Sequence, residues 1–223
     1  MIAEGRVLVN GRVPEPGCQV QESDEVLANG KRLARQTEKL LLFNKPAGVV
    51  CTAGTKDRAV TVNEYLRLKE HLFPVGRLDK DSEGLLLLTN MGDLAEKIAR
   101  AGSEHEKEYI VTCRCPLSGA FIDRMRRGVK ITIPANRSTT GEEETYVTRP
   151  CRVDRLDDLT FRIVLTEGKN RQIRRMSEAL GNKVTSLKRV RIMNILLGDL
   201  ETGKTRNATQ EELCELKKLA DPE

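Results

Sequence analysis

The feature that most constrains the fold is a run of four leucines in "LLLLTN" (85–90), which follows directly on the acid-rich segment "GRLDKDSEG" (76–84). An unbroken apolar run of this length indicates a buried strand. The segment before it sets Asp79, Asp81 and Glu83 on alternate positions. Charges that dense are typical of a solvated turn, so the pattern leaves open whether any of the three acids does chemistry.

Length and composition limit the class of protein. The chain has 223 residues, of which 39% are apolar, enough for one large domain or for a small module and a medium one with a proper core. No apolar stretch approaches the roughly 20 residues that a membrane helix needs. The N-terminus has no apolar core of signal-peptide length. We therefore expect a soluble cytoplasmic protein that does not contact membranes.

The first 36 residues read as a small separate module. Asn10-Gly11 in "RVLVNGRV" is a strong hairpin signal, and "DEVLANGKRL" adds a further strand and turn. A polar stretch then leads to the next apolar segment. We place the domain boundary at Gln36, which gives a module at 1–36 and a larger domain at 37–223.

The larger domain has the pattern of an α+β fold. Strand patterns and helical spacing mix without a regular βαβ rhythm, and Asp157-Asp158 forms a turn between antiparallel strands. Gly181 is expected just past the end of one helix, and Thr209 with Glu212 forms a capping box for another. We expect a mixed, mainly antiparallel sheet flanked by helices. Strands are predicted at 85–90, 108–113, 160–166 and 183–192, and helices at 62–68, 94–100, 170–180 and 211–219.

No metal site is indicated by the ligand types and their spacing. The six cysteines are scattered, and "CRC" (113–115) is the only close pair. No second pair completes four ligands, so reduced buried thiols are favoured over structural zinc. The two histidines, His71 and His105, are too few for a His-rich site. His105 is expected to be a hydrogen-bonded surface residue, with a general base as the alternative. A calcium loop over the acidic turn would need ligands where Leu87 and Asn90 stand, which excludes calcium.

Basic residues are concentrated near the C-terminal end. The net charge is only +5, yet eight basic residues and one acid lie between Lys169 and Arg191. A local field of that strength suits a polyanion, although a solvated basic face also fits the composition. Aromatic residues make up only 3% of the chain, which argues against a sheet that grips single strands by serial base stacking.

The residue types alone leave two chemical uses of the acidic turn open. A glycosidase would use two of the carboxylates, one as acid and one as base. Alternatively, one carboxylate is held ionised by cations such as Arg77 and Lys80, and serves as a nucleophile or as half of a salt bridge.

Four motifs in order carry a resemblance to a known family. "GRLDKDSEGLLLLTN" resembles the catalytic-aspartate motif of bacterial pseudouridine synthases of the RsuA/RluB/RluE/RluF type. "LLLFNKPAGVVCT", "HEKEYIVT" and "EGKNRQIRRM" are similar to the family's other motifs. "RAGSEHEKEYIV" and "LKRVRIMN" are most similar to the group of the large-subunit synthase F (RluF).

The resemblance implies the pseudouridine synthase fold and the isomerisation of uridine to pseudouridine in RNA. It implies no metal, nucleotide or redox cofactor, and a monomer acting on 23S ribosomal RNA, with tRNA as the alternative substrate. The opening module is similar to the latter part of an S-four-type RNA-binding module, and is expected to be partial because "MIAEGRV" stands where that module's second helix would end. A non-enzymatic RNA- or ribosome-binding factor with the same fold is the competing hypothesis.

The resemblance also implies the roles of individual residues. Asp79 matches the catalytic aspartate, Arg174 the arginine that pairs with it, and Tyr109 the residue that stacks on the extruded uracil. Asp81 and Glu83 are then expected to be solvated loop acids. RNA contacts are expected from Arg77, Leu78, Lys80, Arg171, Gln172, Ile173, Arg175, Leu187, Lys188 and Arg189.

Overall fold

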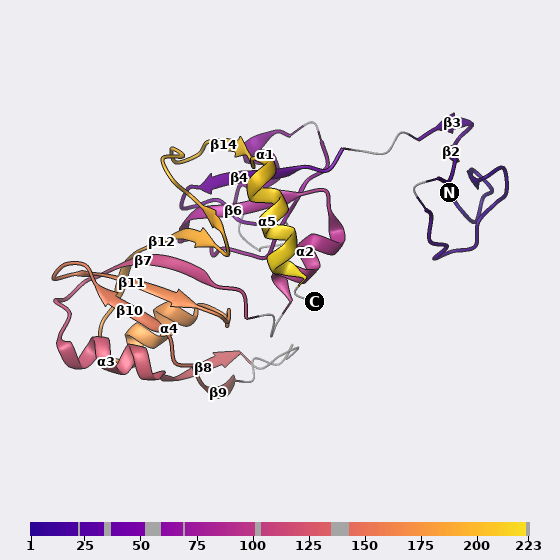
Figure 1. Ribbon diagram of the computed structural model, residues 1–223. Helices are drawn as coiled ribbons and strands as arrows, with labels where there is room; N and C mark the ends of the chain where they lie inside the picture. The colour runs from indigo at the N-terminus through magenta and orange to yellow at the C-terminus, as the bar shows by residue number, and fades with distance from the viewer. Residues whose placement is uncertain are drawn as a thin grey trace. The chain divides into compact units, whose positions relative to one another are not determined.

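The computed structural model describes residues 1–21, 23–33, 37–51, 59–68, 70–100, 104–134 and 143–221 (Figure 1). The chain divides into two compact units, Met1–Glu38 and Lys39–Glu223. The predicted boundary at Gln36 lies outside the described residues, and the assignment of the two domains stays a prediction.

The Met1–Glu38 unit contains a three-stranded antiparallel sheet. Its strands are β1 (Val7–Val9), β2 (Val26–Ala28) and β3 (Lys31–Arg32), in that order across the sheet. Both residues of the predicted Asn10-Gly11 turn have positive φ angles, as a tight turn of this kind requires. An isolated β-bridge between Val9 and Arg12 closes the turn. Along its length β1 pairs with β2 and not with the segment that follows the turn.

A nine-stranded mixed sheet organises the Lys39–Glu223 unit. In chain order its strands are β4 (Leu40–Lys45), β5 (Phe73–Pro74), β6 (Glu83–Thr89), β7 (Lys107–Cys113), β10 (Arg152–Arg155), β11 (Thr160–Leu165), β12 (Val184–Ile192), β13 (Ile195–Leu196) and β14 (Thr205–Asn207). Across the sheet the order is β10-β11-β7-β12-β6-β4-β14, with β13 beside β12 and β5 beside β6. β6 and β12 pair in parallel, and the other described pairs of this sheet are antiparallel.

Helices pack on this sheet in separate groups, which confirms the expected α+β class. The helices are α1 (Val62–Leu66), α2 (Gly92–Ala99), α3 (Gly119–Arg127), α4 (Gln172–Ala179) and α5 (Gln210–Ala220), and a separate hairpin joins β8 (Lys130–Pro134) to β9 (Glu143–Val147). In Figure 1, α2 and α5 lie side by side near β6, while α3 and α4 lie beside β10 and β11. The predicted capping box of Thr209 and Glu212 is present, and Gly181 follows the α4 C-cap with a φ of 79°.

The leucine run forms the part of β6 that is buried on both faces. Leu85 and Leu87 pack in one core with residues of α2 and α5, whereas Leu86 and Leu88 pack in another with residues of α1. All four leucines are 0% exposed. Burial of each contributes roughly 1.5 to 3 kcal/mol to folding, so the acidic turn is attached to one of the most firmly held strands of the unit.

Two expectations about cysteine and histidine are wrong in part. Cys51 and Cys113 are buried free thiols as expected, but Cys115 is exposed, since β7 ends at Cys113 and the two thiols do not share a strand face. Cys18 and Cys214 are exposed as well. His105, expected at the surface, is 9% exposed, and burial lowers its pKa. Among the described residues no group of three or more potential ligands could hold a metal ion.

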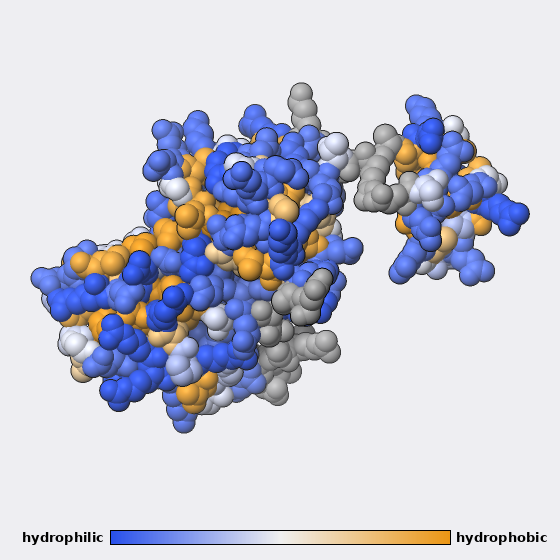
Figure 2. Space-filling view, viewed as in Figure 1, coloured by the Kyte–Doolittle hydropathy of each residue, from blue (hydrophilic) through white to orange (hydrophobic). Residues whose placement is uncertain are grey.

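The visible surface is mainly polar. Figure 2 shows hydrophilic residues over most of the visible face of the Lys39–Glu223 unit, with hydrophobic groups scattered among them. None of the described helices has the length and apolar character needed to cross a membrane.

Candidate functional site

The acidic turn, 76–82, connects β5 to β6 and is held by bonds from several parts of the chain. Within the turn, the Ser82 N–H donates to the Asp79 carbonyl at 3.1 Å. From the loop after β4, the Gly48 N–H donates to the Lys80 carbonyl at 2.7 Å. The Leu78 N–H donates to the Cys51 thiol sulfur at 3.2 Å. The acids of the turn are therefore presented by a fixed backbone.

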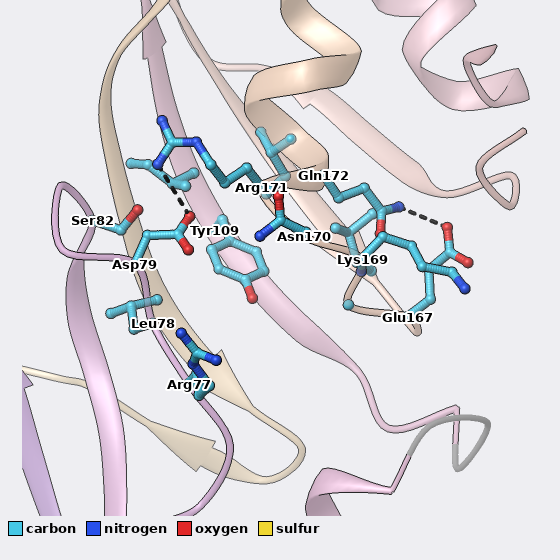
Figure 3. A pocket seen from close by; sticks show the side chains of 14 residues that line it. Arg77, Leu78, Asp79, Ser82, Tyr109, Glu167, Lys169, Asn170, Arg171 and Gln172 are labelled. Carbon is cyan, nitrogen blue, oxygen red and sulfur yellow. Dashed lines mark hydrogen bonds and ion pairs between the residues drawn. The ribbon is translucent and has the colours of Figure 1, made fainter. Parts of the chain in front are cut away.

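A cavity of about 300 Å³ lies beside this turn (Figure 3). Its walls come from the turn itself, from Tyr109 on β7, from Leu187 on β12, and from the segment 165–173 that leads into α4. The Asp79 carboxylate and the Tyr109 ring lie next to each other in Figure 3. The sheet order explains this meeting, because β12 hydrogen-bonds to both β6 and β7.

Sequence reasoning named thirteen site residues, and eight of them line the cavity: Arg77, Leu78, Asp79, Tyr109, Arg171, Gln172, Ile173 and Leu187. Sequence reasoning missed six other lining residues: Ser82, Leu165, Glu167, Gly168, Lys169 and Asn170. Four of the six belong to the motif "EGKNRQIRRM", so the signal was present although no role was assigned. The remaining named residues, Lys80, Arg174, Arg175, Lys188 and Arg189, do not line this cavity.

Arg174 contacts the turn at Asp81 rather than at Asp79. Its Nη2 donates to the Asp81 carbonyl at 2.9 Å and to Ser82 Oγ at 3.3 Å, and its Nε lies 3.4 Å from Asp81 Oδ2. Its side chain is only 8% exposed. Among the described residues, the ion pair of Asp79 is with Arg171, whose Nη1 lies 3.7 Å from Asp79 Oδ2. The expected pairing of Arg174 with Asp79 is therefore replaced here by contacts that fix the backbone of the turn.

Asp81 is an exposed acid of the turn, as expected, but it is also paired, which the sequence did not predict. Arg171 donates to its two carboxylate oxygens in a fork, each bond 2.9 Å long. These bonds lower the pKa of the Asp81 carboxyl, and the nearby Arg174 charge acts in the same direction. Glu83 is the first residue of β6 and is half-buried.

Arg189 is buried, which contradicts a role as a surface contact. It is 3% exposed, and its Nε donates to the Leu85 carbonyl at 2.7 Å while Nη1 donates to the Arg77 carbonyl at 3.3 Å. Arg175 also bonds within the protein, through Nη1 to the Thr132 carbonyl at 2.7 Å. The contacts expected of Lys80 and Lys188 stay predictions.

Lys45 is a buried cation near the turn that sequence reasoning did not single out. It is 0% exposed, and its Nζ donates to the Pro46 carbonyl at 2.9 Å and to the Val49 carbonyl at 2.7 Å. Burial lowers the pKa of Lys45, while the negative charge of Asp79 acts against that shift. Lys45 thus fixes the loop that bonds the acidic turn and adds positive charge near Asp79. Its signal was its place in the motif "LLLFNKPAGVVCT".

Comparison with known proteins gives a consistent result. The sequence model of the family described as RNA pseudouridylate synthase matches residues 39–179. The chain is 42% identical to the dual-specificity RNA pseudouridine synthase RluF of Salmonella typhi, over 99% of this chain and 73% of that protein. It is 34% identical to the ribosomal large subunit pseudouridine synthase B of Bacillus subtilis, over 99% of this chain and 89% of that protein.

Solved structures agree with the sequence comparison. A crystal structure of a pseudouridylate synthase matches with a TM-score of 0.69 and 31% identity, over 98% of this chain and 90% of that one. The human RNA pseudouridylate synthase domain containing 1 matches in fold, with a TM-score of 0.52 and 16% identity over 85% of this chain and 95% of that one. The motifs, the fold and the sequence similarity together lead to one conclusion: the chain belongs to the RNA pseudouridine synthase family and is an RNA-modifying isomerase.

Proposed function

We propose that this synthase converts a uridine of 23S ribosomal RNA to pseudouridine, with Asp79 as the catalytic group and the target base flipped out against Tyr109. The observation that carries the proposal is that these two residues, from motifs far apart in the chain, line one cavity of about 300 Å³. A similar relative named for the ribosomal large subunit supports this choice of RNA.

Asp79 is the best candidate among the carboxylates that line the cavity. The other one, Glu167, accepts hydrogen bonds from Tyr146 Oη at 2.6 Å, from Gln172 Nε2 at 2.6 Å and from the Arg149 N–H at 3.0 Å. Those bonds occupy Glu167 within the protein. Within the described part of the chain Asp79 has one ion pair, at 3.7 Å, and 36% of its side chain is exposed. It is therefore the carboxylate that a bound uridine can reach.

The reaction exchanges one bond of the nucleotide for another. The bond from the ribose C1′ to N1 of uracil breaks, the base turns, and a bond from C1′ to C5 forms. C5 loses its proton and N1 takes one up, so the product is an isomer of the substrate. Asp79 acts as the nucleophile or as the group that steers the detached uracil. No atom is gained and no electron is transferred, so we expect the reaction to run in the presence of EDTA.

The surroundings of Asp79 suit a flipped base. Flipping a base out of its stack costs a few kcal/mol, and an aromatic face such as that of Tyr109 offsets part of this cost. Leu78, Ile173 and Leu187 add apolar walls to the cavity. Arg171 contributes positive charge, its Nη1 lying 3.7 Å from Asp79 Oδ2.

The Met1–Glu38 unit is proposed to be the latter part of an S-four-type module that adds to RNA binding. The support is its resemblance to that module and its antiparallel sheet with the Asn10-Gly11 turn. We further propose that the protein acts as a monomer in the cytoplasm.

The test is to incubate the protein with unmodified 23S RNA, 16S RNA and tRNA, and to map pseudouridine by chemical labelling and reverse transcription. We expect a new pseudouridine in 23S RNA, formed equally with and without EDTA. Modification confined to tRNA or to 16S RNA would overturn the substrate assignment. RNA binding without any new pseudouridine would favour the non-enzymatic hypothesis.

Arg174→Lys should lower the single-turnover rate by roughly 10- to 100-fold and should also lower the melting temperature. Lysine keeps the charge but cannot bond the Asp81 carbonyl and Ser82 Oγ in the geometry of a guanidinium. A hydrogen bond to a charged group contributes about 1.5 to 3 kcal/mol, and each 1.36 kcal/mol of barrier is about tenfold in rate.

Arg171→Lys is the matched control for this substitution. Its pair with Asp81 is exposed on both sides and is worth about 0 to 1 kcal/mol, so the rate should fall less than about fivefold. If the two lysine variants slow the reaction equally, Arg174 has no special part in fixing the turn.

A further inference from the structure

A second cavity, of about 410 Å³, adjoins the first one. The two cavities share the wall formed by Arg77, Tyr109, Glu167, Gly168 and Lys169. The second cavity is basic: among the residues that the structure describes, six cations and one carboxylate, that of Glu167, line it. These cations are Arg77, Arg100, Lys107, Arg149, Lys169 and Arg189.

The carboxylate of Glu167 offsets only part of this charge: its Oε2 lies 3.9 Å from Arg149 Nε, and it carries one negative charge against six positive ones. Arg149 bonds Glu104 through Nη1 at 2.6 Å, and Lys169 lies over the Tyr146 ring at 4.3 Å. Of the six cations that line the second cavity, Lys107 on β7 and Arg189 on β12 are the two that belong to strands of the sheet. Two of the six positive charges are therefore held by strands of the sheet, and the other four come from residues outside its strands.

The strand register brings Lys107 and Arg189 together beside Tyr109. Lys107 and Tyr109 are two residues apart on β7 and share one face, and Arg189 on β12 lies opposite Tyr109. Arg189 is 3% exposed, and its Nη2 has no hydrogen-bond partner among the described residues. Lys107 Nζ donates to the His105 carbonyl at 3.1 Å.

This pair of cations is unfavourable in the free protein. Burial, and secondly the charge of Arg189, lower the pKa of Lys107 to about 8. A buried cation with an unpaired N–H group costs free energy that an anion would recover. The cavity therefore has the properties of a site for an anionic group.

We propose that the second cavity binds a backbone phosphate of the RNA next to the target uridine, with Lys107 in direct contact and Arg189 as a fixed charge behind it. This subsite rests on the proposed function. A nucleotide carries its phosphates only a few bonds from its base, so a base stacked on Tyr109 brings its backbone to the adjoining cavity. Phosphate contacts of this kind set the register of the nucleic acid on the protein.

The subsite also connects RNA binding to the catalytic turn. Arg189 bonds the carbonyls of Arg77 and Leu85, which lie on either side of Asp79 in the chain. A phosphate in this cavity would therefore lie close to the side chain that joins the two ends of the turn. The Arg189 guanidinium would thus help to fix both the RNA backbone and the turn that carries Asp79.

Lys107→Gln tests the subsite without the need for activity. The substitution removes one of two repelling cations, so the melting temperature in chloride should stay the same or rise. The probe is inorganic phosphate, compared with chloride at equal ionic strength. Phosphate should raise the melting temperature of the wild-type protein above its value in chloride, and this difference should vanish in Lys107→Gln. The matched control is Lys130→Gln, an exposed lysine on β8, which should keep the difference.

A retained phosphate effect in Lys107→Gln, or no effect in the wild-type protein, would overturn the proposal. The second measurement is RNA affinity at several salt concentrations, with a 23S RNA fragment that contains the mapped uridine. Loss of one phosphate contact should flatten the log–log slope by about 0.7 to 0.9 and weaken binding by roughly 3- to 10-fold at low salt. Lys130→Gln should change neither.

The two proposals fail in different ways. If pseudouridine forms in 23S RNA but the slope of Lys107→Gln is unchanged, the phosphate subsite is wrong and the proposed function stands. If the phosphate effect depends on Lys107 but no RNA is modified, the proposed function is wrong and the anion site stands.

Discussion

Asp79→Asn is expected to reduce pseudouridine formation to background, a loss of at least about 1,000-fold. Asparagine keeps the shape of the side chain and removes both the charge and the nucleophilic oxygen. Losses of this size or larger follow the removal of a catalytic nucleophile in other enzymes. The measurement is single-turnover formation of pseudouridine on 23S RNA, with RNA binding followed in parallel.

The same variant should fold and bind RNA normally. The pair of Asp79 with Arg171 is 3.7 Å long and partly exposed on both sides, so losing it costs about 0 to 1 kcal/mol. Phosphate contacts supply most of the affinity for RNA, and a carboxylate makes none of them. Removing a negative charge near the RNA backbone should, if anything, tighten binding.

The neighbouring acids, Asp81 and Glu83, are the controls for this prediction, and the structure predicts a different effect for each. Glu83→Gln should keep most of the activity. Asp81→Asn should lose a few-fold, since it weakens the fork with Arg171 and the contact with Arg174 that fix the turn. If Asp79→Asn remains active while Asp81→Asn or Glu83→Gln is dead, the catalytic role has been given to the wrong acid.

The parts of the fold that the sequence predicts well are those that depend on local pattern. The leucine run becomes the buried strand β6, and the capping box of Thr209 and Glu212 begins α5. The helix α3 and the hairpin of β8 and β9 were not predicted. α3 has only three buried residues between exposed polar ones, and β8 alternates strictly but is short. The parallel pairing of β6 with β12 joins segments about 100 residues apart, which no local pattern specifies.

The site was predictable in its residue types but not in all of its pairings. The motifs bring Asp79 and Tyr109 to attention, and the fold puts them in one cavity. The partner of Arg174 was not predictable, because a long guanidinium side chain reaches several acids and carbonyls, and the backbone path of the turn decides between them. The burial of Arg189 was hidden for a related reason. Its charge suggests a surface position, while its two guanidinium hydrogen bonds, to the carbonyls of Leu85 and Arg77, and its depth depend on other parts of the chain.

Gly84→Ala is expected to be the most destabilising single-methyl change in the acidic motif. Gly84 has a φ of 104°, a region that residues with a side chain rarely adopt. An added Cβ would lie 2.2 Å from the Arg189 carbonyl oxygen and 2.7 Å from the Arg189 nitrogen. Both are backbone atoms, so no side chain can move aside to make room.

The position in the sheet makes this clash hard to relieve. Gly84 and Arg189 are register partners in the parallel pairing of β6 and β12, and β6 is buried on both faces just beyond that point. Backbone strain and overpacking together should cost about 3 to 5 kcal/mol. For a chain of this size, that lowers the melting temperature by roughly 6 to 20 °C.

Gly92→Ala is the matched control, because it adds the same methyl group where there is room. Gly92 is the first residue of α2, has no positive φ, and an added Cβ would meet nothing within 4 Å. Alanine there should be neutral or stabilising by about 0.4 to 1 kcal/mol. Thermal unfolding of the two variants compares them directly, and equal melting temperatures would show that β6 and β12 can separate at Gly84.

If the strands hold their places as we expect, any folded Gly84→Ala protein should also lose turnover, since the strain falls five residues from Asp79, at the end of the turn that positions it.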